Sequence, residues 1–343
     1  MSRRAQLAAW VDRAGLADLV LRTRAQLPQH ALTVVTYHRV QPSHAPAPFD
    51  EQVIDATPES FDSQLGTIAQ HFRTVGIDDL IGFLDGKPLP PNPILITFDD
   101  GYRDNRTHAL PLLQKHGLRA VFFVVSKAIE ERRVFWWDRI AYLIKQSTRT
   151  ALDLTYPSRF HIPLEPRRPA IDAVLRLVKD GWNLDLARFL DELAVAAGVS
   201  YTRQDDQRHA NSLLMTWDEV RQLADAGMDV ESHTRTHRLL GTIPPDQLSD
   251  ELRGSRQELE AVLDRPVRAL AYPAGGGDAT TRPVLRDALR AAGYQLAFTS
   301  ATGINQLVVA PTLDRFGIRR VCIDHDLPPS YFRAFLAMPF LRP

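Results

Sequence analysis

Short apolar runs, many of them rich in β-branched residues, alternate with amphipathic stretches along the chain from residue 32 onward. Most of these runs are continuously apolar, which is typical of parallel strands that are covered on both faces. The strand candidates are Leu32–Tyr37, Ile94–Phe98, Ala120–Val125, Met228–Ser232, Val267–Tyr272, Leu296–Thr299 and Arg319–Ile323. Repetition of strand, helix and strand predicts right-handed crossovers, and therefore an α/β fold built on a parallel barrel or sheet.

The helices expected between these strands have recognisable ends. Thr57 stands before Pro58, a pair that favours the start of a helix. Thr216 and Glu219 form a capping-box pattern, and Gly227 lies where that helix should end. These ends support the assignment of the intervening stretches as helices.

Three segments depart from this repetition. Residues 1–27 are amphipathic, which predicts a helix that packs on the barrel or, as the alternative, lies on a membrane surface. Residues 130–212 are mostly helical in pattern and hold proline-rich turns, which indicates an insertion that could act as a lid. The expected organisation is an N-terminal helical segment, a two-part barrel, a helical insertion and a C-terminal tail, at residues 1–30, 31–129 with 213–326, 130–212 and 327–343.

The composition argues against several classes of protein. Of 343 residues 44% are hydrophobic, and 41 Lys and Arg balance 41 Asp and Glu, so a nucleic-acid binder is not expected. The single cysteine, Cys322, rules out an internal disulfide framework and fits a reducing compartment. Asp12 and Arg13 interrupt the N-terminal apolar run, which argues against a secretory signal, and no stretch approaches the roughly 18 apolar residues of a transmembrane helix. We therefore expect a cytoplasmic protein.

Two carboxylates directly follow one strand candidate. Asp99 and Asp100 stand at the end of Ile94–Phe98, where adjacent negative charges are costly unless a cation lies beside them. Consecutive side chains point in different directions, so one can bind a metal while the other stays free to accept a proton. Gly101 lets the backbone turn sharply after them.

Two histidines follow another strand candidate. His233 and His237 are four residues apart, a spacing that places both imidazoles on one face of a helical turn, as in helices that chelate zinc. Each motif alone is only moderately specific, because paired aspartates and spaced histidines are common on protein surfaces. Their position at the ends of two strands of one barrel indicates a shared site.

The sequence Thr-Phe-Asp-Asp-Gly at 97–101 and the sequence Ser-His-Thr-x-x-His at 232–237 together resemble the motifs of one known family. These are the polysaccharide deacetylases with a NodB-homology domain, carbohydrate esterase family 4. The resemblance covers residues 32–130 and 213–325, and it implies a distorted (β/α)7 barrel.

The resemblance also implies a site. A divalent metal, usually zinc, is expected to be held by Asp100, His233 and His237, with Asp99 as the general base. A metal in such a site polarises the acyl carbonyl and activates water, which then attacks the amide.

A departing amine also needs a general acid. In much of the family a late histidine supplies it, and the candidate here is His325. In the subgroup resembling the biofilm poly-N-acetylglucosamine deacetylases, an early Tyr-His pair does so, and Tyr37-His38 fits that pattern. We therefore predict His38 as the acid, with His325 as the alternative; a purely structural role for His38 is the other interpretation left open.

A third family motif normally holds an arginine that orients the base and a tyrosine near the oxyanion. Here Ala271 and Ala274 occupy those two positions, a variant that also resembles the biofilm subgroup. The cation that orients Asp99 must then come from elsewhere, and Arg319 and Arg320 are the candidates.

Three residues are candidates for contact with substrate. Tyr272 begins a loop to Gly276 that could shape the acyl pocket, although a plain barrel turn is equally compatible. Trp137 could stack on a sugar ring or anchor a helix in the core. Arg103 could contact substrate, and a solvated salt bridge is the simpler interpretation.

The expected activity is removal of N-acetyl groups from an amino-sugar oligosaccharide or polysaccharide, or from its lipid-linked precursor. The same chemistry would serve an O-acetyl esterase or a deformylase. A non-catalytic carbohydrate-binding relic would be expected to lose the base or a ligand, and Asp99, Asp100, His233 and His237 are all present.

Overall fold

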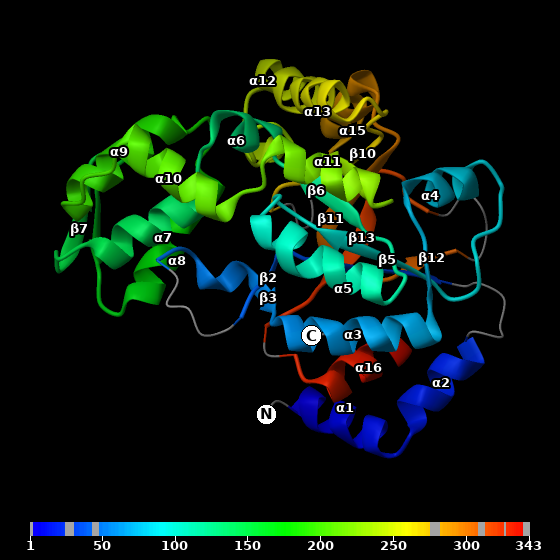
Figure 1. The fold of residues 1–343 in the computed structure, drawn as a ribbon. Coiled ribbons are helices and arrows are strands. Elements are labelled where there is room, and N and C mark those ends of the chain that lie inside the picture. The colour runs from blue at the N-terminus through cyan, green and yellow to red at the C-terminus, as the bar shows by residue number, and fades with distance from the viewer. Residues whose placement is uncertain are drawn as a thin grey trace.

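Seven parallel strands close into a barrel in the computed structural model, which describes residues 3–24, 31–42, 48–274, 282–307, 313–325 and 327–338 (Figure 1). In spatial order the strands are β1 (Ala31–Tyr37), β5 (Pro93–Phe98), β6 (Val121–Val124), β9 (Asp229–Ser232), β10 (Ala269–Ala271), β11 (Leu296–Thr302) and β13 (Ile318–Cys322). Pairing of β13 with β1 closes the ring. Spatial order equals chain order, so the (β/α)7 barrel is confirmed, and each of the seven strand candidates forms one of its strands.

Helices cover the outside of the barrel. They are α3 (Pro58–His71), α4 (Ile77–Leu84), α5 (Leu110–Lys115), α6 (Ser126–Glu131), α11 (Trp217–Asp225), α12 (Pro245–Ser249), α13 (Ser255–Leu263) and α15 (Pro283–Ala292). Four short strands accompany the barrel: β2 (Arg39–Val40) pairs with β3 (Ile54–Ala56), β4 (Arg73–Thr74) pairs with β5, and β12 (Asn305–Gln306) pairs with β1. Single turns of π-helix occur at Asn105–Ala109 and Asp250–Gly254, and single turns of 3-10 helix occur at Glu51–Val53 and Leu240–Thr242.

The helix ends expected from the sequence are present. The Thr57 hydroxyl accepts a hydrogen bond from the Ser60 backbone N–H at 3.1 Å at the start of α3. Thr216 and Glu219 bond reciprocally at the start of α11. Both caps satisfy backbone N–H groups that have no partner within their helix.

Alternate residues of the strands face two different cores. Leu32 and Val34 of β1 belong to a buried cluster with Phe123 and other strand residues, which fills the barrel. Val35 and Tyr37 belong to a second cluster that includes residues of the surrounding helices. The strands are thus covered on both faces, as their continuous apolar character indicates.

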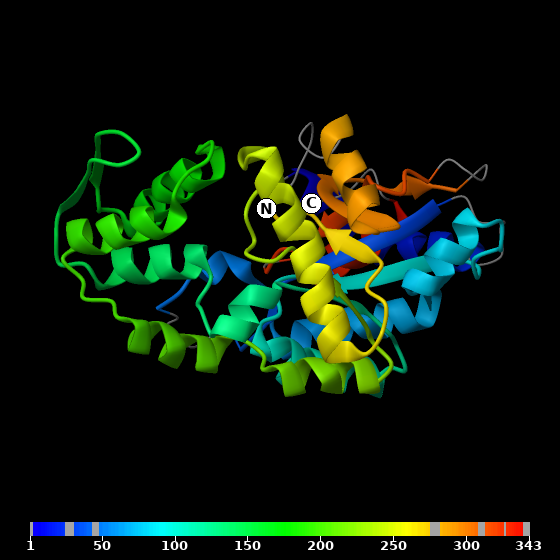
Figure 2. The same ribbon diagram turned by 90° about the horizontal axis from the view of Figure 1, so that it is seen from above.

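Residues 130–212 are mostly helical and project from one side of the barrel (Figures 1 and 2). They contain α7 (Trp136–Gln146), α8 (Arg167–Asp180), α9 (Leu186–Ala197), α10 (Arg203–Leu213) and a hairpin of β7 (Ala151–Leu154) and β8 (Phe160–Pro163). The hairpin is absent from the sequence-based prediction. These elements have their own hydrophobic cluster, which extends to Phe49 and Tyr102 of the barrel.

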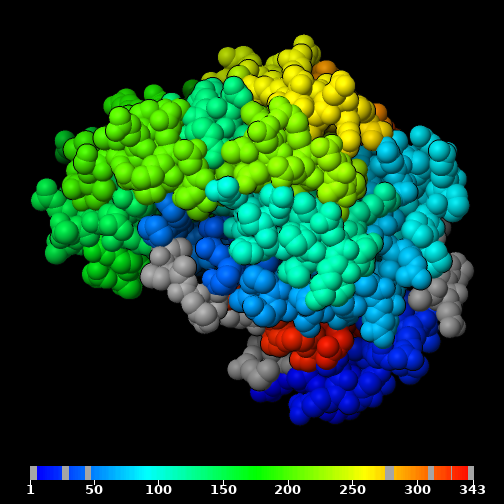
Figure 3. Space-filling view, viewed as in Figure 1, coloured from blue at the N-terminus to red at the C-terminus, as the bar shows by residue number. Residues whose placement is uncertain are grey.

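The N-terminal helices and α16 (Pro329–Ala337) form one layer beneath the barrel, in which α16 lies between α3 and the N-terminal helices (Figure 3). Residues 1–27 were expected to form one helix, but the described part forms α1 (Arg3–Arg13) and α2 (Leu16–Arg24), because Gly15 adopts a left-handed conformation between them (φ 70°). The segment expected as a C-terminal tail forms α16 (Pro329–Ala337), with Phe332 and Phe335 buried. Among the described helices, none has the length and apolar character needed to cross a membrane.

Candidate active site

Asp99 and Asp100 lie at the end of β5 and are both buried. The Asp99 N–H donates to the Tyr37 carbonyl at 2.9 Å and extends the pairing with β1. Asp100 and Gly101 then adopt consecutive left-handed conformations (φ 76° and 94°), which turn the chain sharply. A Cβ on Gly101 would lie only 3.1 Å from Val124, so this turn suits glycine. The turn separates the two carboxylates, as the sequence predicts.

Asp100, His233 and His237 form a cluster whose potential ligand atoms all lie within 4.8 Å of one another. The Asp100 Oδ1 atom is 3.4 Å from His233 Nε2 and 3.5 Å from His237 Nε2. It is buried and has no hydrogen-bond partner among the described residues, a costly arrangement unless a cation lies between these atoms. His233 donates from Nδ1 to the Ala271 carbonyl at 2.8 Å, which leaves the Nε2 lone pair free for a metal. The three side chains therefore fit a divalent metal.

The histidines do not lie on a helical turn, contrary to the sequence-based expectation. They belong to a loop after β9, in which Thr234 and His237 have positive φ values of 65° and 58°. The Ser232 hydroxyl accepts from the Thr234 N–H, and the Thr234 hydroxyl accepts from the His237 N–H, both at 3.1 Å. These local bonds replace helical ones and still bring the imidazole centroids to 4.7 Å.

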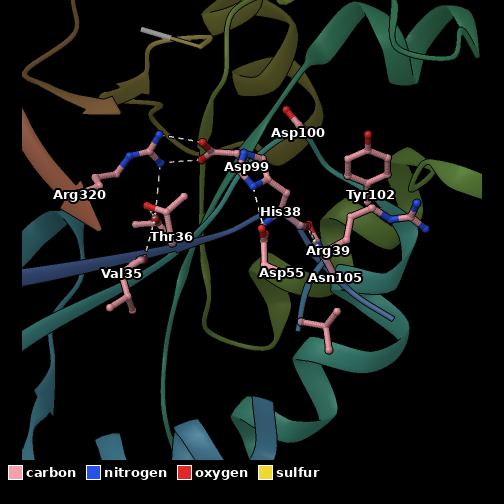
Figure 4. Close-up of polar contacts among 12 residues, drawn as sticks. Val35, Thr36, His38, Arg39, Asp55, Asp99, Asp100, Tyr102, Asn105 and Arg320 are labelled. Carbon is pink, nitrogen blue, oxygen red and sulfur yellow. Dashed lines mark hydrogen bonds and ion pairs between the residues drawn. The ribbon is translucent and has the colours of Figure 1, made fainter. Parts of the chain in front are cut away.

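Asp99 forms a bidentate ion pair with Arg320 of β13 (Figure 4). Both N–H···O distances are 2.7 Å, and the Arg320 side chain is only 1% exposed. Arg320 Nε also donates to the Thr299 carbonyl at 3.1 Å, which fixes the guanidinium. Burial raises the pKa of Asp99, but the charge of Arg320 outweighs it and holds that pKa well below its usual range. Of the two candidates for the orienting cation, Arg320 rather than Arg319 pairs with Asp99.

His38 stands at the end of β1 and pairs with Asp55 of β3, at 3.1 Å between Nδ1 and Oδ2. The His38 backbone N–H also donates to Asp55, and Asn105 donates to the His38 carbonyl at 2.8 Å. Burial lowers the pKa of His38, but the charge and hydrogen bond of Asp55, with the charges of Asp100 and Asp99, raise it to about 10. Nδ1 is occupied, so Nε2 is the nitrogen left for a substrate. Figure 4 shows His38 and Asp55 on the side of Asp99 away from Arg320.

Sequence reasoning missed Asp55. The only signal was a carboxylate within the short apolar run Ile54–Ala56, a pattern too brief to interpret without the fold. Its pairing with His38 joins β3 to the end of β1, two segments whose proximity depends on the closed barrel.

These groups share one pocket of about 380 Å³. His38, Asp99, Asp100, His233 and His237 all line it, and so do Ala274, Ser300, Cys322 and one face of α8. His325 is exposed and does not line this pocket. An ionised carboxylate, a protonated imidazole and a metal-binding cluster in one pocket can together perform metal-assisted hydrolysis of an acyl group.

The three candidates for substrate contact have different surroundings. Trp137 lines the pocket, where its ring centroid is 4.4 Å from that of His237 and its Nε1 donates to the Tyr102 hydroxyl at 2.8 Å. Tyr272 is buried away from this pocket and donates to the Phe316 carbonyl at 3.1 Å. Arg103 is outside the pocket too, with Nε 2.8 Å from Glu219. Of the three, only Trp137 therefore lies beside the candidate catalytic groups. Gly276, which ends the loop after Tyr272, lies outside the described residues.

Comparison with known proteins identifies a family for this chain. The sequence model described as "Polysaccharide deacetylase" matches residues 86–297. The protein YxkH of Bacillus subtilis (strain 168), whose name places it among the polysaccharide deacetylases, is 20% identical over 245 residues, 71% of this chain. This alignment spans 56% of YxkH, so the chain corresponds to little more than half of that relative.

Solved structures share the fold. The deacetylase PplD of Streptococcus pyogenes, in complex with acetate, aligns with 87% of this chain and 95% of its own, with a TM-score of 0.56 and 16% identity. IcaB of Ammonifex degensii aligns with 90% of this chain and 97% of its own, with a TM-score of 0.55 and 20% identity. Because the family model covers more than half of the 343 residues and the barrel is common to these structures, this chain belongs to the polysaccharide deacetylase family.

Proposed function

We propose that this protein is a metal-dependent hydrolase that removes N-acetyl groups from an amino-sugar oligosaccharide or polysaccharide, or from its lipid-linked precursor. The observation that carries the proposal is that one pocket holds two groups in opposite protonation states, a carboxylate without its proton and an imidazole with one. Asp99 is held ionised by Arg320, and His38 is held protonated by Asp55. A base must begin a turnover without its proton and an acid must begin with one.

Asp100, His233 and His237 would hold the metal, for which zinc suits the mixed nitrogen and oxygen donors. When bound there, a divalent metal supplies a Lewis acid that polarises the acyl carbonyl and favours attack by water. Asp99 accepts the proton of the attacking water at a carboxylate oxygen. His38 donates a proton from Nε2 to the departing nitrogen, and Asp55 keeps the imidazole in the required orientation.

The protonated state of His38 favours an amide over an ester as the bond cleaved. An amine is a poor leaving group unless it is protonated, whereas an alcohol depends on this less. A pKa raised to about 10 keeps His38 charged at neutral pH, which suits the more demanding leaving group. The acetate bound to PplD is the product that an acetylated substrate would release, and it supports acetyl rather than formyl as the group removed.

We also propose that the protein acts in the cytoplasm on a soluble or lipid-linked intermediate. The N-terminal helices support contact with a membrane surface, because Leu7, Trp10 and Leu19 are exposed there, with Trp10 59% exposed. Exposed arginines at positions 13 and 22 could face anionic lipid headgroups.

The test compares metal content and acetate release for the wild type and Asp99→Asn on short N-acetylglucosamine oligomers. We expect metal in both proteins and acetate from the wild type alone. Asp153→Asn, an exposed position on the insertion hairpin, is the matched control and should behave as the wild type. Absence of metal from both proteins, or equal acetate release by Asp99→Asn, would contradict the proposal.

A further inference from the structure

Helix α8 of the insertion supplies one wall of the catalytic pocket. The residues that it contributes recur at spacings that place them on one helix face: Arg168, Asp172, Leu175, Arg176 and Lys179. Other residues of α8 are buried in the hydrophobic cluster of the insertion, among them Ile171, Val174 and Val178. The helix is therefore held by its apolar face and presents a charged face to the pocket.

Arg168 is already committed to neighbouring carboxylates. It lies 2.5 Å from Asp50 and also pairs with Asp172 one turn along α8. The Asp50 backbone N–H in turn donates to Asp138 of α7 at 3.0 Å. This network fixes α8 against the segment that leads into β3, so the position of its charged face is well determined.

Arg176 and Lys179 differ from Arg168, because neither has a hydrogen bond or an ion pair with any residue that the structure describes. Both are exposed and both line the pocket. Of the carboxylates that line the pocket, Asp50 and Asp172 pair with Arg168, Asp99 pairs with Arg320, and Asp100 belongs to the cluster with His233 and His237. The charge of this wall that remains unpaired within the described chain is thus positive.

We propose that Arg176 and Lys179 select a substrate in which the acetylated amino sugar carries, or adjoins, an anionic group. This inference rests on the proposed function and names the class of its substrate. The shared chemistry is a phosphoryl or carboxylate group, which reaches α8 while the acetamido group reaches Asp99 and His38. A guanidinium binds either group through paired N–H donors, and a lysine adds a second charge one turn away.

Two sources would supply such a group. A glycosyl phosphate, as in a nucleotide-linked or lipid-linked sugar, places the charge on the sugar that bears the acetamido group. A uronic acid in an oligosaccharide places a carboxylate on the next sugar. A neutral oligomer of N-acetylglucosamine offers neither and would leave both cations without a partner.

The kinetic test measures kcat/KM for acetate release from three substrates: N-acetylglucosamine 1-phosphate, a disaccharide of N-acetylglucosamine and glucuronic acid, and a neutral chitodisaccharide. We expect the wild type to prefer at least one anionic substrate over the neutral one. In Arg176→Gln/Lys179→Gln the ratio of anionic to neutral kcat/KM should fall by about tenfold, mainly through KM. Arg159→Gln, which removes a cation of the insertion outside the pocket, should leave the ratio unchanged.

A binding test separates this inference from the proposed function. Calorimetry with N-acetylglucosamine 1-phosphate uses Asp99→Asn, which retains the pocket without turnover, with and without the two glutamine substitutions. We expect binding to weaken by about tenfold when both cations are removed, and the difference to shrink in high salt. If no substrate yields acetate but binding still depends on the two cations, the proposed function fails and this inference stands. If acetate is released with no preference for charge, or the glutamine variant loses all substrates equally, this inference fails and the proposed function stands.

Discussion

The barrel side of the candidate catalytic pocket holds buried or partly buried groups, most of them paired with one another, whereas the insertion side includes a helix face with exposed charges. Asp99 with Arg320, and His38 with Asp55, lie at the ends of strands whose register fixes them. Arg176 and Lys179 stand on α8, which rests on a separate hydrophobic cluster. The difference suggests a division of labour, in which strand ends provide the chemistry and the insertion provides recognition.

One buried polar network joins the two sides. The Tyr102 hydroxyl, just after β5, donates to Asp138 of α7 at 2.7 Å and accepts from Trp137 at 2.8 Å. Asp138 also accepts the Asp50 N–H, and Asp50 pairs with Arg168 of α8. We therefore expect the effects on activity and stability to be largest for variants on the barrel side, moderate for variants in this network, and smallest for variants at the rim.

The largest effect is expected from the proposed metal site of Asp100, His233 and His237. Removal of one ligand in His233→Ala should lower bound metal and kcat/KM by more than about a hundredfold, since even partners outside the ligand set can account for 10–100-fold. Metal analysis and acetate release measure both. The matched control is His161→Ala, an exposed histidine of the insertion, which should bind metal as the wild type does. Full metal content in His233→Ala would contradict the site.

Arg320→Met should have the next largest effect and tests the buried ion pair. It leaves Asp99 as a buried charge without its partner, so the free energy of unfolding should fall by about 3–5 kcal/mol. Asp99, the proposed base, should also lose its orientation, which lowers kcat. Arg319→Met is the matched control, because its side chain points to solvent from the same strand. Denaturant unfolding that gave equal stability for the two variants would refute the assignment of Arg320.

Most of the barrel side could be predicted from the sequence, because its residues directly follow recognisable strands. Asp99, Asp100, His233 and His237 each follow a strand whose apolar run is visible, and the ends of parallel strands meet at one rim. For the cation that pairs with Asp99, the sequence offers two adjacent candidates, Arg319 and Arg320. Strand alternation decides which of them faces into the barrel, and the register of β13 decides whether that side chain lies beside Asp99.

The insertion side could not be predicted in this way. Amphipathic periodicity identified helices in residues 130–212, but not which face of α8 meets the pocket. The prediction of a helical turn at His233 was wrong for another reason. The hydroxyls of Ser232 and Thr234 accept hydrogen bonds from the local backbone, and these bonds replace the expected helical turn. Long-range partners such as Asp55 leave no local pattern at all.

Asp55→Asn tests whether His38 is the general acid, through the pH dependence of activity. In Asp55→Asn the pKa of His38 should fall, because Asp55 is the main group that raises it. The acid must be protonated, so activity is lost as pH rises through that pKa, and the alkaline limb should move to lower pH by about one pH unit or more. A pH profile of kcat/KM measures this. If the limb stays in place while activity falls, Asp55 has only a structural role and the alkaline limb belongs to another group.

Tyr102→Phe, in the network between the two sides, should have a moderate effect. It removes one hydroxyl that serves both Asp138 and Trp137, so the free energy of unfolding should fall by about 1–3 kcal/mol. Tyr142→Phe is the matched control, because its hydroxyl has no hydrogen bond to the part of the insertion and barrel that the structure describes. Equal stability of the two variants would mean that the network does not couple the insertion to the barrel.

The smallest effect is expected from Arg103→Ala, which tests how far the recognition surface extends around the rim. Arg103 follows the metal-binding motif in sequence, yet its side chain is 48% exposed and pairs with Glu219 of α11 rather than lining the pocket. An exposed ion pair contributes about 0–1 kcal/mol, and Glu219 keeps its capping role at the start of α11 without it. The free energy of unfolding should therefore fall by no more than about 1 kcal/mol, and kcat/KM for neutral and anionic substrates should change by less than about twofold. A selective loss with the anionic substrate would instead place Arg103 beside Arg176 and Lys179 and extend recognition onto the barrel, which would blur the contrast between the two sides.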